Sequence, residues 1–233
     1  MSKPENQNVR NSSLSYLALR QALGILGLAL PVLIWIFNDF ELESSISHFY
    51  YSPSSVIFTG FMITFGIFLI FYPGRKKDKT DRISDNLVTT IGGFGAILTA
   101  LIPTAYYSAC EKPLYYTIEL TDFCGLTKLT TQYMHNNHVL GTIHLFSAAL
   151  FLILMGYMSW ARFTKGNTSR GMKVFYRICA AMVWIPLVII GVEFLLDKEW
   201  TQYDVYICEC ISLGFFGLAW LVKGKTFKRF GFH

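Results

Sequence analysis

The side chains best suited to chemistry gather in one short segment, FELESSISHFYYSPSS, at residues 40–55. Ser44 and His48 are four residues apart, so one helical turn would bring the hydroxyl and the imidazole together. A serine beside a base is the arrangement of an activated nucleophile, and Glu41 or Glu43 could orient the histidine. Serines at a helix start more often cap its backbone N–H groups. The segment therefore supports two interpretations, a serine hydrolase and a capped turn.

Four further ionisable residues are predicted to lie at one depth: His138, His144, Glu193 and Glu209. With His48 they offer the ligand types that zinc prefers. However, His138 and His144 are six residues apart, and no familiar metal spacing occurs. A second interpretation is packing, in which His144 forms a hydrogen bond with Glu209 or Glu193. A third is that the group binds a ligand, and the sequence leaves all three open.

These residues must be positioned by helices that cross a membrane. The 233-residue chain is 53% hydrophobic and only 15% charged, against about 25% charged in a soluble domain. A helix satisfies the hydrogen bonds of its own backbone in lipid. Each apolar run is close to the ~20 residues that a helix needs to span a hydrocarbon core of ~30 Å. The predicted fold is all-α, an integral membrane bundle of six transmembrane helices, at residues 16–38, 54–73, 86–107, 138–161, 172–196 and 204–223.

The distribution of Lys and Arg predicts cytoplasmic N and C termini. Of the 20 basic residues, only Lys112, Lys128 and Lys198 fall on the opposite side, and positively charged loops stay in the cytoplasm. The predicted organisation is a cytoplasmic tail, a six-helix transmembrane domain with an outer loop at 108–137, and a basic cytoplasmic tail, at residues 1–15, 16–223 and 224–233. We expect a multi-pass protein of the plasma membrane, the bacterial inner membrane.

The cytoplasmic charges are expected to set this topology and to meet anionic lipid. No nucleic-acid partner is expected, because the positive charge follows the predicted membrane topology. No cluster of ionisable residues comparable to the outer one is expected on the cytoplasmic side.

Two cysteines, Cys110 and Cys124, fall in the outer loop. An oxidising outer compartment permits a disulfide between them, which would close a loop of about 15 residues. Two free thiols are the alternative.

The outer polar residues are expected to line one chamber that faces the outer leaflet. Ionisable residues inside a span are costly and indicate function by default. The chamber would bind or handle a membrane lipid or another amphiphile. Two alternatives remain: a membrane-embedded metal- or serine-assisted lipid hydrolase, and a pore-forming or structural homo-oligomer. The sequence indicates no particular cofactor. The expected ligand-binding residues are Ser44, His48, Tyr50, Tyr51, His138, His144, Glu193 and Glu209.

Three stretches resemble known groups of membrane proteins. ESSISHFYYSPSSVIFTGFMITFGIFL and HNNHVLGTIHLFSAALFLILMGYMSW are similar in layout to the first loop, second span and fourth span of the Frag/DRAM/Sfk-type six-helix proteins. ECISLGFFGLAWLVKG resembles the sixth span of an uncharacterised group of bacterial six-helix proteins. The first loop and second span of the Frag/DRAM/Sfk-type proteins often carry an ISD-T-G-PPES-F signature, whose aspartate and first glycine are replaced here by His48 and Phe49. The resemblance implies lipid-related roles, GPI-lipid remodelling in one branch and autophagy modulation in another.

A weaker resemblance is to the CREST hydrolases, which include the alkaline ceramidases. Ser44 and His48 match the first element of that family's pattern. Its later aspartate and its late pair of histidines have no counterpart in this chain.

Overall fold

The computed structural model describes residues 4–75, 83–104, 138–166, 168–196 and 200–226, and all regular structure there is helical. The prediction of an all-α fold is therefore confirmed. A short 3-10 helix, η1 (Ile46–Tyr51), precedes the second helix, and a π-helical turn, η2 (Met158–Arg162), continues α5. The six main helices are α1 (Pro4–Ile36), α2 (Ser55–Ile70), α3 (Asp85–Leu101), α5 (His138–Tyr157), α6 (Arg170–Leu196) and α7 (Asp204–Lys223).

Three helix ends differ from the prediction by three residues or more. α1 begins at Pro4, inside the segment assigned to a cytoplasmic tail, and proline is well suited to the first position of a helix. α2 ends at Ile70 and α3 at Leu101, each shortly before a proline in the sequence. A proline ring disfavours the helical conformation of the residue before it. Each of these helices therefore ends before its apolar run does.

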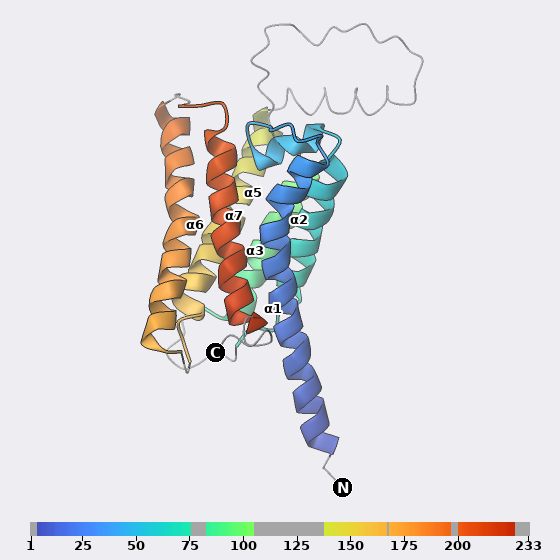
Figure 1. Cartoon of the computed structure of the whole chain (residues 1–233), viewed down its shortest axis with the longest axis vertical. Helices are drawn as coiled ribbons and strands as arrows, with labels where there is room; N and C mark the ends of the chain where they lie inside the picture. Colours follow the sequence, from blue (N-terminus) through green and yellow to red (C-terminus); the bar gives the residue numbers. More distant parts are fainter. Residues whose placement is uncertain (1–3, 76–82, 105–137, 167, 197–199, 227–233) are drawn as a thin grey trace, which may run out of the picture.

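The helices pack in a closed ring in the order of the sequence, and Figure 1 shows this bundle from the side. α1 contacts α2, α2 contacts α3, and the series continues through α5 and α6 to α7, which packs against α1. The start of α1 and the end of α7 lie at the same end of the bundle. We call this the basic end, because Arg20, Arg162 and Lys223 lie there. The opposite end, which holds η1 and Glu209, is called the acidic end.

Four helical segments are long and apolar enough to cross a membrane: Tyr16–Ile36, Val139–Arg162, Arg170–Leu196 and Asp204–Lys223. α2 and α3 are apolar but have only 16 and 17 residues, or about 24–26 Å at 1.5 Å per residue. The structure thus supports an α-helical membrane protein with four such segments among the described residues.

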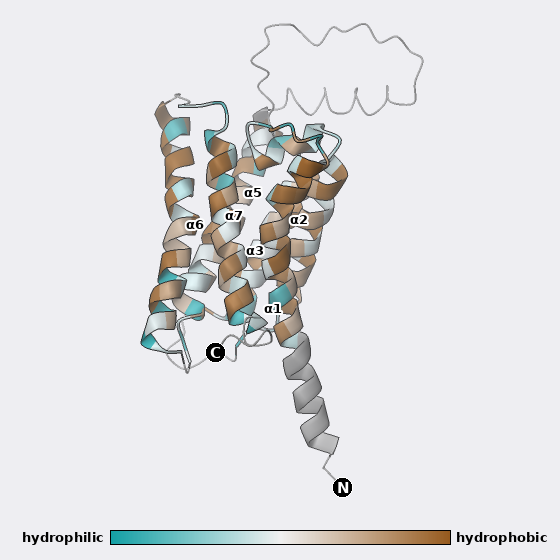
Figure 2. Ribbon diagram, in the orientation of Figure 1, coloured by the Kyte–Doolittle hydropathy of each residue, from teal (hydrophilic) through white to brown (hydrophobic). Residues whose placement is uncertain are grey.

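Hydrophobic residues predominate along the helices (Figure 2), and many of their large side chains are exposed. Phe146, Phe194 and Leu195 are 70%, 72% and 81% exposed. Apolar surface of this extent on a soluble protein would mark an interaction site. On a membrane protein, the same apolar surface is suited to contact with lipid chains.

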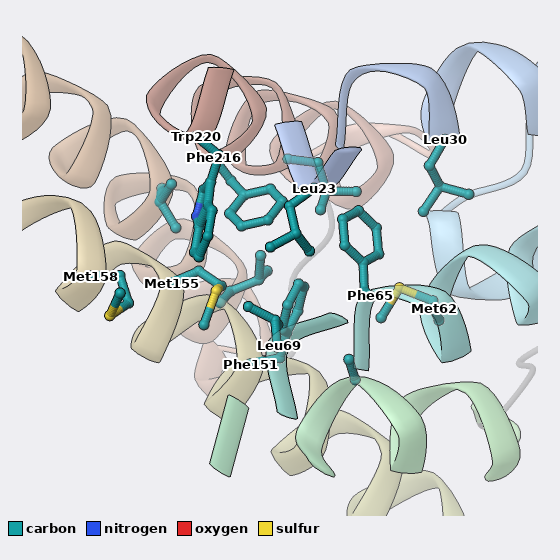
Figure 3. Close-up of a cluster of buried hydrophobic side chains, with 14 of the residues drawn as sticks. Leu23, Leu30, Met62, Phe65, Leu69, Phe151, Met155, Met158, Phe216 and Trp220 are labelled. Atoms are coloured by element: carbon teal, nitrogen blue, oxygen red, sulfur yellow. The ribbon is translucent and has the colours of Figure 1, made fainter. Parts of the chain in front are cut away.

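Aromatic side chains fill the centre of the ring (Figure 3). Phe65 of α2, Phe151 of α5 and Phe216 of α7 pack against one another with ring centroids 5.5–5.9 Å apart. Trp220 extends the cluster from Phe216 at 5.9 Å. All four are at most 2% exposed, so at this level the ring is packed rather than open.

Two pairs of glycines allow helix backbones to touch. A Cβ atom at Gly66 would lie 2.7 Å from the carbonyl oxygen of Gly93, and one at Gly93 would lie 2.6 Å from that of Gly66. Gly24 and Gly217 are related in the same way, at 2.8 Å in each direction. Small residues permit this close packing in membranes, and these pairs set the α2–α3 and α1–α7 contacts.

Candidate functional sites at the two ends of the bundle

The segment at residues 40–55 folds over the acidic end and is tied to α7. The Glu209 carboxylate accepts a hydrogen bond from the backbone N–H of Ile46 at 2.5 Å. The backbone N–H of Tyr206 donates to the carbonyl oxygen of Ser44 at 3.0 Å. Two bonds from successive turns of α7 therefore fix the connector between α1 and α2 above the bundle.

Ser44 and His48 are hydrogen-bonded to each other, hydroxyl to Nδ1. The turn between them is η1, whose N-cap is Ser45; the Ser45 hydroxyl accepts from the backbone N–H of His48 at 3.1 Å. Ser45 thus caps η1, and its neighbour Ser44 contacts the His48 imidazole. This arrangement contains the first contact that a serine nucleophile needs, a base within hydrogen-bonding reach.

His144 is buried at the same end, on α5, with only 2% of its surface exposed. Its hydrogen bond runs from Nδ1 to the carbonyl oxygen of Ile102 at 2.6 Å, rather than to Glu209 or Glu193 as the packing interpretation had it. A carbonyl accepts only, so Nδ1 carries the proton and Nε2 of the neutral ring is an acceptor. Nε2 is buried and has no hydrogen-bond partner among the described residues. His48 lies close enough to interact with this ring electrostatically.

Tyr51 and Tyr50 lie at the end of η1. The Tyr51 hydroxyl donates to the carbonyl oxygen of Thr104 at 2.6 Å and so ties η1 to the segment after α3. Burial, and secondarily Tyr50, raises the pKa of Tyr51 to about 12, so the hydroxyl remains a donor at physiological pH. The Tyr50 ring packs edge to face on Tyr51, with centroids 5.3 Å apart.

The remaining predicted site residues are placed less completely. Glu193 is buried on α6, 6% exposed, within electrostatic range of Cys208 on α7. His138 begins α5, but its side chain lies outside the described residues. Cys110 and Cys124 also lie outside them, so the disulfide stays a prediction. Within the described part of the chain, no three His, Cys, Asp or Glu side chains gather closely enough to hold a metal ion.

A second polar site lies at the basic end, which the distribution of Lys and Arg predicts to be cytoplasmic and which was not expected to hold such a cluster. Arg162 donates through Nε to one oxygen of Asp85, and the other oxygen accepts from the backbone N–H of Arg75 at 2.9 Å. The π-helical turn positions Arg162, because its wider hydrogen bond joins the N–H of Phe163 to the carbonyl of Met158 at 2.9 Å. Such turns occur often at functional sites.

Arg20 connects three elements at this end. Its guanidinium lies over the Tyr16 ring, 3.9 Å from the centroid, and also donates to the Tyr16 hydroxyl. It donates to the Tyr72 hydroxyl at 2.9 Å and to the carbonyl oxygen of Lys223 at 3.2 Å. One side chain of α1 thus holds the end of α7 and Tyr72, which lies two residues beyond the end of α2.

A cavity of about 480 Å³ lies among these groups, within the range of roughly 300–1,000 Å³ typical of ligand sites. The sequence carried a signal for it: Arg20 and Lys223 fall inside predicted spans, and Asp85 directly precedes one. Basic residues that only set topology lie in loops. A charged residue inside a span is costly and therefore indicates a functional site. The charged lining residues are Arg20, Arg75, Arg162, Lys165, Lys223 and Asp85.

Fold and sites together define a helical bundle of membrane-protein type with polar sites at both ends. A comparison of the chain with known protein families, curated proteins and solved structures finds no match.

Proposed function

We propose that this chain binds a lipid or another amphiphile at its acidic end, as a multi-pass protein of six spans with cytoplasmic termini in the bacterial inner membrane. The observation that carries the proposal is the Nε2 atom of His144, buried and without a partner among the described residues. A buried acceptor left unsatisfied costs about 1–3 kcal/mol. A hydroxyl or ammonium group of a lipid headgroup would supply the missing donor.

The surroundings of His144 support a ligand of this kind. His48 is near enough to interact with it, and the connector carrying His48 is held by bonds to Glu209 and Tyr206. Many large hydrophobic side chains of the helices are exposed, which suits acyl chains beside a polar headgroup site. The resemblance to a family with lipid-related roles points the same way.

The binding experiment compares the lipids that remain with the protein after mild detergent extraction. Native mass spectrometry of the full chain should find one lipid class enriched over the membrane extract. His144→Phe removes the Nε2 acceptor while keeping a ring of similar size, and it should abolish that enrichment. Tyr157→Phe, at the far end of α5, is the matched control and should retain it.

Two results would count against the proposal: a bulk-like lipid profile for the wild-type protein, or an enrichment that His144→Phe leaves intact. Thermal unfolding of each variant separates the loss of binding from the loss of fold. A variant that is folded and depleted of the lipid supports a ligand role rather than a packing role.

A second candidate function is a serine-assisted lipid hydrolase, because Ser44 and His48 are already hydrogen-bonded. An active serine should react with a fluorophosphonate probe. Ser44→Ala should then abolish labelling, while Ser52→Ala, at the other end of η1, should leave it unchanged. An absence of labelling in the wild-type protein would reject this candidate.

The metal-assisted lipid hydrolase and the pore-forming or structural homo-oligomer remain predictions of the sequence. Metal analysis of the purified protein tests the metal-assisted hydrolase. The mass of the native protein tests the homo-oligomer.

A further inference from the structure

We propose that the start of α6 and the adjoining turn of η2 form a second lipid site, which binds the headgroup of an anionic phospholipid. The site is called the α6 patch, and its residues are Trp160 of η2 and Arg170, Lys173, Arg177 and Trp184 of α6. The patch lies at the basic end of the bundle and shares no residue with the site proposed around His144. It requires only that the chain is embedded in a membrane, and not that the acidic end binds a ligand.

An arginine side chain is positioned at the centre of the patch. The guanidinium of Arg177 lies over the Trp160 ring, with its carbon 5.5 Å from the ring centroid, which is a cation–π contact. The Trp160 ring packs in turn on Trp184, with centroids 5.9 Å apart. Arg177 is exposed, and none of its five N–H donors meets an acceptor among the described residues. The fold therefore positions this guanidinium and leaves its donors available to a ligand.

Trp184 anchors this stack of side chains against α5. Its indole N–H donates to the carbonyl oxygen of Ile153 at 3.2 Å. Gly156 makes room for the indole, since a Cβ atom at that position would collide with it. The three side chains are thus ordered before a ligand arrives, and a ligand would not have to order them itself.

The positive charge of the patch is not balanced by acids. Arg170, Lys173 and Arg177 are spaced three and four residues apart, so they lie on one face of α6. All three are exposed, and none forms an ion pair with a described residue. The sequence contains no acid between Asp122 and Glu193. The first turn of α6 therefore carries cations and no acid, although the helix dipole favours an anion there. The patch is suited to a negatively charged group.

The depth of the patch and its apolar continuation indicate a phospholipid. Arg177 is seven residues into the segment Arg170–Leu196, which is able to cross a membrane, or about 10 Å from its start at 1.5 Å per residue. Farther along the helix, Ile178, Ile185 and Val188 are 52–64% exposed. A guanidinium fork matches the geometry of phosphate oxygens, and exposed apolar side chains suit acyl chains. An anionic phospholipid combines both groups with the negative charge that the patch requires.

The test titrates the delipidated full chain in a non-ionic detergent and counts bound lipids by native mass spectrometry. The probes are dioleoyl phosphatidylglycerol and dioleoyl phosphatidylcholine, which share their acyl chains and a phosphate diester but differ in net charge. Phosphatidylglycerol should bind more tightly by roughly fivefold or more, which corresponds to about 1 kcal/mol. Arg177→Gln should weaken its binding about tenfold. Lys225→Gln removes one charge from an exposed residue beyond α7 and should have an effect below about twofold.

Two further variants separate headgroup recognition from general attraction. Arg177→Lys keeps the charge but loses the planar fork, so it should also weaken the binding of phosphatidylglycerol severalfold. Arg170→Gln with Lys173→Gln removes the neighbouring charges and should bring the affinities for the two lipids together. All three side chains are exposed, so we expect these variants to fold, and thermal unfolding verifies it.

The proposal is overturned if the wild-type protein binds the two lipids equally, or if Arg177→Gln and Lys225→Gln lose the same affinity. It is also overturned if the native protein is a dimer that Arg177→Gln converts to a monomer, because the patch would then be a contact between two copies of the chain. His144→Phe should leave the binding that depends on Arg177 unchanged, so failure of this site is separable from failure of the site at the acidic end.

Discussion

Asp85 and Arg162 form an ion pair that joins the start of α3 to the end of η2, and each residue is only 4% exposed. Two charges withdrawn from water in this way depend on each other, since neither can be solvated alone. The pair therefore holds the α3–α5 contact in a single arrangement at the basic end.

Removal of one partner should be far more damaging than loss of a surface charge. Asp85→Asn removes the Asp85 carboxylate from the buried Arg162 guanidinium, and we expect a loss of about 3–5 kcal/mol in the free energy of unfolding. Denaturant titration in mixed micelles measures it, with the exposed Glu41→Gln as control. Pairing with Arg162→Gln should restore part of the loss, and strictly additive effects would show that the pair is not coupled.

Glycine-to-alanine changes at two positions of α2 should have opposite signs. Alanine is the better helix former by roughly 1 kcal/mol, so Gly60→Ala, with no atom within 4 Å of its new Cβ, should be neutral or stabilising. Gly66→Ala places a Cβ 2.7 Å from the Gly93 carbonyl oxygen and should destabilise by about 1–3 kcal/mol. Thermal unfolding of both variants checks the contrast, and equal shifts would contradict the close α2–α3 contact.

Glu209 should hold the connector through its carboxylate oxygen. Glu209→Leu removes the acceptor of the Ile46 N–H, so we expect residues 40–55 to open and to be cleaved several times faster in limited proteolysis. Glu209→Gln keeps an oxygen at the same position and should behave nearly as the wild type. Rapid cleavage of the Gln variant as well would indicate that charge, rather than this bond, anchors the connector.

Glu43 should make stability depend on pH. Burial, and secondarily Glu41, raises the pKa of Glu43 above its ordinary value of 4.5. The folded state therefore binds the proton more tightly than the unfolded one, so the stabilising contribution is complete below pH 4.5 and is lost as the pH rises through the raised pKa. Glu43→Gln should gain stability relative to the wild type between pH 4 and 7. A constant difference across that range would contradict this assignment.

Three helices could be placed closely from the sequence alone. The runs 138–161, 172–196 and 204–223 correspond to α5 with η2, α6 and α7 within two residues at each end. The exclusion of water from a membrane sets the length of such runs, and no proline follows them closely. Pro73 and Pro103 lie within two of the other apolar runs, and their restricted backbone ends each helix before the apolar run ends.

The site at the basic end could not be read from the sequence in the same way. Arg20 and Lys223, which meet there, are 203 residues apart, and only the closed ring makes them neighbours. Nor does apolar periodicity reveal the π-helical turn that carries Arg162 into the interior. At the acidic end, the four-residue spacing did predict the contact of Ser44 with His48. The partner of His144 is a backbone carbonyl, and side-chain chemistry gives no signal for that choice.

The contact between α1 and α7 also bears on the order of assembly during synthesis. α1 is made before α7, which carries its partners Gly217 and Lys223. Until α7 is inserted, the face of α1 that carries Arg20 and Gly24 lacks the helix against which it packs, so the nascent chain must tolerate an incomplete bundle. Closing the ring through α1 and α7 therefore waits for the insertion of α7, and a chain truncated before residue 204 would lack the helix that closes it.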